Sequence, residues 1–123
     1  MRIFIADGRK SVRHALAVLL AAQQDLHIAG EASCGEELLS QATAIDADIA
    51  LVDWELPGLA ELGGFAALRK RYPALPIVAL SGRPDVRRAA QTAGVTAFVS
   101  KGDPPERLLA AIRQCTEPAN WEV

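Results

Sequence analysis

Hydrophobic residues gather in five short runs along the chain, separated by longer stretches with helical spacing. The runs cover residues 3–6, 27–32, 48–52, 77–80 and 97–100. Most are continuous rather than alternating, which is typical of parallel strands covered on both faces. Five strands that alternate with five helices through right-handed crossovers predict an α/β fold. We expect a (βα)5 doubly wound parallel sheet in a three-layer sandwich.

The fourth predicted helix, about residues 84–93, differs from the others in its inward stripe. That stripe consists of Val86, Ala89, Ala90 and Ala93, nearly all of them small. Small side chains bury little apolar area, so weak docking is one expectation, and a weakly docked helix is a candidate for motion. The equal alternative is that small residues simply let this helix lie close to the sheet.

Length and composition fit one folded domain. The chain has 123 residues, of which 50% are hydrophobic and 23% charged. We place the domain at residues 1–116 and interpret residues 117–123 as a tail or the start of a linker. The net charge of −2 disfavours binding of DNA or an acidic membrane by charge alone. The absence of a long apolar run, a signal peptide and paired cysteines indicates a cytoplasmic setting without a membrane span.

Four polar residues follow the predicted strands: Asp7 the first, Asp53 the third, Ser81 the fourth and Lys101 the fifth. Because the carboxyl ends of parallel strands share one edge of a sheet, these side chains should meet in one crevice. Two close carboxylates attract a divalent cation, and a carboxylate can be a nucleophile that forms an aspartyl phosphate. The Lys101 ammonium group can neutralise one phosphoryl oxygen, and the Ser81 hydroxyl can donate a hydrogen bond to another. The set therefore favours phosphoryl acceptance by Asp53.

Four segments in sequence order support a family resemblance. They are IFIADGRKSVRHAL, ALVDWELPG, IVALSG and AFVSKGDPPERLLAAI. Over residues 2–116 the chain resembles the receiver domain of two-component response regulators, in particular receivers that precede a helix-turn-helix output domain. The resemblance implies a flavodoxin-like sandwich with strand order 2-1-3-4-5. It also implies a phosphoprotein that acts in phosphorelay signal transduction and transcription regulation, and not an enzyme beyond self-phosphotransfer and self-dephosphorylation.

The resemblance assigns roles by position. Asp53 matches the phospho-acceptor, and Asp7 matches the first acid of the family's metal-binding pair. Ser81 matches the hydroxyl that turns toward the phosphate, and Lys101 matches the lysine that pairs with it. Phe98 matches the aromatic residue whose rotamer reports the signalling state, with ordinary strand-end packing as the alternative.

The metal site departs from the family pattern. The second acid of the pair, which binds magnesium most directly in the family, is Gly8 here. Mg²⁺ is therefore expected to bind weakly or not at all, through Asp7, Asp53 and the backbone carbonyl of Glu55. The Glu55 side chain either helps to hold the ion or is a solvated loop acid. Loss of a charged ligand weakens such a site by about 1–3 kcal/mol.

Two hypotheses about function remain open within this fold. In the first, Asp53 accepts a phosphoryl group from a sensor histidine kinase, and a protein-protein interaction face switches. In the alternative, the chain is an atypical receiver that acts as a phosphorylation-independent interaction module, because Gly8 replaces an acid. A homodimer and a C-terminal DNA-binding output domain outside this chain are further expectations. These residues themselves should not bind nucleic acid.

Cationic residues also gather near the predicted crevice. They either steer a phosphorylated donor or form a solvated rim. They are Arg9, Lys10, Arg83, Arg87 and Arg88. A haloacid-dehalogenase-like phosphatase is disfavoured by the short chain, and a flavodoxin-like electron carrier by the lack of a phosphate-binding loop after the first strand.

Overall fold

A computed structural model describes residues 1–41 and 46–116 of the chain. Its sheet contains five parallel strands in the order β2-β1-β3-β4-β5. The strands are β1 (Arg2–Ala6), β2 (His27–Ala32), β3 (Ile49–Asp53), β4 (Ile77–Ser81) and β5 (Ala97–Ser100). The predicted (βα)5 sheet and its strand order are confirmed, with strand ends within one residue of the apolar runs.

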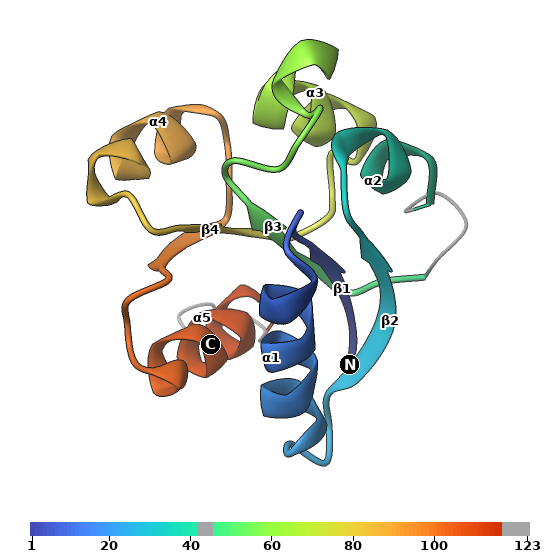
Figure 1. The fold of residues 1–123 in the computed structure, drawn as a ribbon, viewed down its shortest axis with the longest axis vertical. Coiled ribbons are helices and arrows are strands. Elements are labelled where there is room, and N and C mark those ends of the chain that lie inside the picture. Colours follow the sequence, from blue (N-terminus) through green and yellow to red (C-terminus); the bar gives the residue numbers. More distant parts are fainter. Residues whose placement is uncertain (42–45, 117–123) are drawn as a thin grey trace, which may run out of the picture.

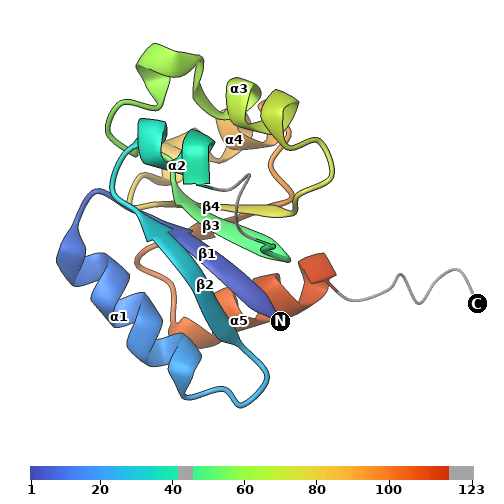
Figure 2. The same ribbon diagram turned by 90° about the vertical axis from the view of Figure 1, so that its right-hand side faces the viewer.

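Among the described residues, five α-helices cover the two faces of this sheet. They are α1 (Lys10–Ala21), α2 (Gly35–Gln41), α3 (Gly64–Arg71), α4 (Arg87–Thr92) and α5 (Pro105–Thr116). Helices α1 and α5 lie on one face, and α2, α3 and α4 lie on the other (Figures 1 and 2). This is the predicted three-layer sandwich. The predicted tail, residues 117–123, lies outside the described residues.

The inner strands are buried on both faces, which explains their continuous apolar sequences. In β1, Ile3 and Ile5 pack in the core beneath α1 and α5, while Phe4 packs in the opposite core. In β3, Leu51 packs in the core beneath α1 and α5, and Val52 packs in the opposite core. Successive residues of a strand point to opposite faces, so a strand between two helical layers needs apolar residues at every position.

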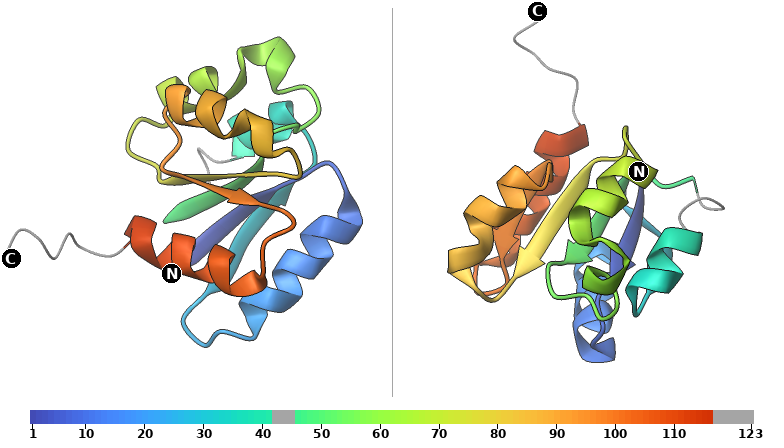
Figure 3. Two further views of the ribbon diagram at one scale, coloured as in Figure 1. Left: turned by 90° about the vertical axis from the view of Figure 1, so that its left-hand side faces the viewer. Right: turned by 90° about the horizontal axis from the view of Figure 1, so that it is seen from above.

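The predicted fourth helix is divided into two pieces. A 3₁₀ turn, η2 (Pro84–Val86), precedes the six-residue helix α4. Val86 and Ala90 are buried, but Ala89 is exposed and Ala93 is half-buried, so the expected inward stripe is only partly correct. Helix α4 lies over the edge of the sheet formed by β4 and β5 (Figure 3).

The loop between β3 and α3 contains an additional turn, η1 (Ala60–Leu62). Leu56 and Leu59 anchor this loop in the core of the α2–α4 face. Within the ranges 1–41 and 46–116, no helix is both long and apolar enough to span a bilayer.

Candidate functional site

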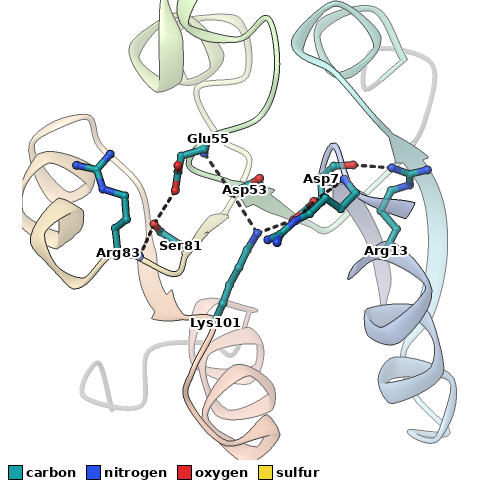
Figure 4. A network of polar contacts seen from close by, with 8 residues as sticks. Asp7, Arg13, Asp53, Glu55, Ser81, Arg83 and Lys101 are labelled. Carbon is teal, nitrogen blue, oxygen red and sulfur yellow. Dashed lines mark hydrogen bonds and ion pairs between the residues drawn. The ribbon is translucent and has the colours of Figure 1, made fainter. Parts of the chain in front are cut away.

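The carboxyl edge of the sheet carries a cleft of about 570 Å³. Asp7 and Asp53 come to it from the ends of β1 and β3, and Lys101 follows β5. Ser81 ends β4 beside the cleft and is fully buried. The four residues that the sequence predicts to converge therefore lie together (Figure 4).

Lys101 joins the two carboxylates at the bottom of this site. Its Nζ lies 2.8 Å from Oδ2 of Asp7 and 3.3 Å from Oδ1 of Asp53. The Asp7 and Asp53 side chains are only 2% and 10% exposed. Two nearly buried carboxylates repel one another, and a shared ammonium group offsets that repulsion.

Asp7 is held by hydrogen bonds from the start of α1. The backbone N–H of Arg9 donates to Asp7 Oδ1 at 2.8 Å, and the Arg9 Nε lies 3.9 Å from the same oxygen. Arg13 donates from Nη1 to the Asp7 carbonyl at 2.6 Å and from Nε to Glu31 at 3.1 Å. Both Asp7 carboxylate oxygens are thus in contact with donors, and its backbone is fixed from α1.

Ser81 and Glu55 form a second group on the other side of Asp53. The Ser81 hydroxyl accepts a hydrogen bond from the Arg83 backbone N–H at 3.0 Å and donates to Glu55 Oε1 at 3.4 Å. The Glu55 backbone N–H donates to Asp53 Oδ1 at 3.1 Å. The Glu55 side chain is therefore directed toward Ser81 rather than toward Asp7 (Figure 4).

Arg83 lines the cleft and is already paired. Its Nη2 donates to Asp85 Oδ2 at 3.0 Å. This hydrogen bond raises the pKa of Arg83 and lowers the pKa of the Asp85 carboxyl. Both groups remain charged at neutral pH.

Gly8 leaves no room for a second acid in the present loop conformation. A Cβ at this position would lie 2.8 Å from both Cγ and Cδ of Pro57. Asp7 and Asp53 supply two carboxylates, and Mg²⁺ is commonly held by one or two carboxylates with several waters. Within the described part of the chain, no three acidic, histidine or cysteine side chains are grouped to hold a metal ion. Asp7 and Asp53 are therefore two carboxylates in this cleft that could hold Mg²⁺ together with waters.

Phe98 lies half-buried on β5, with the Arg87 guanidinium 4.7 Å from the centre of its ring. Trp54, which directly follows Asp53, stacks on Phe65 with ring centroids 4.7 Å apart. The contacts of Arg13 with Asp7 and of Arg87 with Phe98 were missed by sequence reasoning. Neither has a sequence signal, because Arg13 bonds the Asp7 backbone carbonyl, a group that every residue has, and Arg87 and Phe98 lie on different elements.

The family model described as the response regulator receiver domain matches residues 3–113. The response regulator GacA of Pseudomonas aeruginosa is 29% identical over 117 residues, covering 93% of this chain and 54% of GacA. The transcriptional regulatory protein DesR of Bacillus subtilis is 29% identical over 111 residues, covering 90% of this chain and 56% of DesR. The chain thus spans about half the length of these curated relatives.

Solved structures show the same fold. RcsB from Salmonella enterica, bound to promoter rprA in the presence of phosphomimetic BeF3⁻, superposes with a TM-score of 0.83 at 20% identity, covering 94% of this chain and 61% of RcsB. The response regulator domain of Thermotoga maritima CheB superposes with a TM-score of 0.83 at 22% identity, covering 96% of this chain and 98% of that domain. The comparisons give no support to the alternative of a phosphorylation-independent interaction module.

Proposed function

Because the chain belongs to the response regulator receiver domain family, we propose that Asp53 accepts a phosphoryl group from a sensor histidine kinase. The observation that carries this proposal is the contact of Lys101 Nζ with Asp53 Oδ1, at 3.3 Å, in an open cleft. The ammonium group pairs with the Asp53 carboxylate and is placed to neutralise charge on the incoming group.

The proposed transfer uses the second Asp53 oxygen as the nucleophile. Oδ1 contacts Lys101 and the Glu55 N–H, so Oδ2 attacks phosphorus. The new O–P bond forms as the P–N bond of the phosphohistidine breaks, and the electron pair of that bond stays on the imidazole nitrogen. Lys101 donates to one phosphoryl oxygen, and the Ser81 hydroxyl donates to another after it leaves Glu55.

Mg²⁺, when bound, would be held weakly by Asp7, Asp53 and the Glu55 carbonyl, and it would neutralise negative charge on the phosphoryl oxygens. The redirected Ser81 hydroxyl gives Phe98 room to rotate, and α4 follows. The face formed by α4, β5 and α5 then changes its affinity for a partner, including a second copy of this chain. A phosphoryl group shifts such an equilibrium only through contacts that differ between the two states.

The names of the relatives support a DNA-binding output domain as a further partner. RcsB is described as bound to a promoter, and DesR is named a transcriptional regulatory protein. We propose that this domain works in the cytoplasm with a DNA-binding output domain outside the 123 residues, while its own residues do not contact DNA. Its own chemistry is limited to self-phosphotransfer and self-dephosphorylation.

The test is incubation with acetyl phosphate and Mg²⁺, followed by intact-mass spectrometry. We expect one phosphoryl group per chain, lost on treatment with hydroxylamine and absent in Asp53→Asn. The matched control is Asp25→Asn, an exposed acid in the α1–β2 loop, which should be phosphorylated like the wild type. An adduct that persists in Asp53→Asn, or no adduct at all, contradicts the proposed function.

A further inference from the structure

The charged groups that line the cleft are balanced without a metal ion. Asp7 and Asp53 face Lys101 and Arg9, while Glu55 lies near Arg83, which also contributes to the cleft wall. Lys101 contacts both Asp7 and Asp53, and Arg9 contacts Asp7. Two carboxylates at the centre of the site are therefore matched by two side-chain cations.

The residues that would bind a divalent cation are already engaged. Asp7 Oδ1 accepts from the Arg9 N–H at 2.8 Å, and Asp7 Oδ2 accepts from Lys101 at 2.8 Å. A divalent cation at Asp7 would compete with these two donors for the carboxylate oxygens. The ring of Pro57 lies where an acidic side chain at Gly8 would begin, so a third carboxylate cannot enter without movement of Pro57.

Arg9 is the cation that can move toward a new anion. Its side chain is 65% exposed, and its ion-pair contact with Asp7 is long, at 3.9 Å. Arg83, in contrast, is paired with Asp85 at 3.0 Å. Arg9 caps α1 without a side-chain hydrogen bond to the helix, so its guanidinium is not needed to begin that helix.

We propose that an oxyanion of phosphoryl size at Asp53 is held by Arg9 together with Lys101, and that its binding does not require a divalent cation. The inference rests on the proposed function of Asp53 and names the cations that act there. Conversion of a carboxylate into an acyl phosphate adds about one negative charge. A guanidinium group binds two phosphoryl oxygens at once, which suits it to receive that charge.

The experiment measures phosphorylation by acetyl phosphate in EDTA and in MgCl2, by intact mass, for wild type, Arg9→Gln and Lys10→Gln. The attacking Asp53 oxygen forms the O–P bond, and acetate leaves with the electrons of the broken bond. We expect the wild-type rate in EDTA to stay within about threefold of the rate in Mg²⁺. Loss of one charged hydrogen bond should slow Arg9→Gln in EDTA about tenfold or more. Lys10→Gln removes a neighbouring exposed cation and should behave like the wild type.

A second readout observes Arg9 directly. Beryllofluoride is added in a Mg²⁺-free buffer without chelator to the wild type and to Asp53→Asn, and the NMR resonance of the Arg9 Nε–H is followed. A shift in the wild type that is absent in Asp53→Asn supports the inference, even if acetyl phosphate gives no covalent adduct and the proposed function fails.

The remaining outcomes separate the two proposals. An adduct that forms only with Mg²⁺ overturns the inference and leaves the proposed function standing. If the adduct forms in EDTA at the same rate in Arg9→Gln as in the wild type, the proposed role of Arg9 is overturned. If no adduct forms and the Arg9 resonance does not shift, both proposals are overturned.

Discussion

Gly8→Asp replaces the missing acid of the metal site, and the structure predicts a loss of stability without Mg²⁺ that Mg²⁺ offsets. The backbone of Gly8 has no positive φ, so an aspartate does not strain it. The new Cβ, however, would lie 2.8 Å from two ring atoms of Pro57. Overpacking of this kind typically costs about 1–3 kcal/mol. The added carboxylate also lies next to Asp7, whose side chain is only 2% exposed. In EDTA the variant should therefore unfold more easily than the wild type.

Mg²⁺ should reverse this loss. One additional charged ligand is worth about 1.5–3 kcal/mol, which corresponds to roughly 10- to 150-fold tighter binding. At a Mg²⁺ concentration about 100 times the dissociation constant, binding to the folded state adds about 2.7 kcal/mol to the free energy of unfolding. That gain is of the same size as the steric loss, so saturating Mg²⁺ should bring Gly8→Asp back to about wild-type stability.

The assay is urea unfolding followed by Trp54 emission in a Trp121→Phe background, with EDTA or with MgCl2. Gly8→Asn is the matched control, since it has the same shape without the charge: it should lose the same stability and gain little from Mg²⁺. Gly8→Ala isolates the contact with Pro57. The reasoning is refuted if Mg²⁺ stabilises the aspartate and asparagine variants equally, or if Gly8→Ala unfolds at the same urea concentration as the wild type.

Three further predictions concern residues around the site and in the frame that supports it. Arg69 donates to the carbonyls of Tyr72, Leu75 and Gly94, so Arg69→Met should lower the free energy of unfolding in urea by about 1.5–3 kcal/mol, whereas Lys70→Met should change it little. The Ser33 hydroxyl and N–H hold the pKa of Glu37 below its usual range, so this contribution to stability is present above the ordinary glutamate pKa and is lost as the pH falls through the depressed one. Glu37→Gln should therefore lose less stability on acidification than the wild type, measured by thermal unfolding across that range; an equal loss contradicts the assignment. Arg87→Gln should remove the cation–π interaction with the Phe98 ring, which is worth about 0.5–1 kcal/mol. The Phe98 ring resonances should then shift more than they do in Arg88→Gln, and equal shifts would count against the contact.

The sheet and the meeting of the four site residues could be predicted because both follow from strand direction. Ile3, Phe4 and Ile5 are apolar in succession because each faces one of two cores. Once the strands are parallel, their carboxyl ends must share an edge, and Asp7, Asp53 and Lys101 reach the same cleft.

Features that depend on how separate segments contact one another could not be predicted. The spacing of Val86, Ala89, Ala90 and Ala93 suggested one docked helix, but the chain forms a 3₁₀ turn before a short α4. Ala89 consequently points outward. The spacing of alanines carries no signal for this break, because alanine suits an exposed helical position as well as a buried one.

The effect of Gly8 also extends beyond the number of metal ligands. Gly35, at the start of α2, donates its backbone N–H to the Pro57 carbonyl at 2.8 Å. A Cβ on Gly35 would lie 2.6 Å from the Cα of Leu59. The loop after Asp53 therefore packs against two glycines, Gly8 between β1 and α1 and Gly35 at the start of α2, and a side chain on either would push it outward. Because the Glu55 N–H in this loop binds Asp53 Oδ1, the same packing that excludes a second acid also fixes a donor on the acceptor carboxylate. The loss of a metal ligand and the ordering of the acceptor are thus two consequences of one close contact.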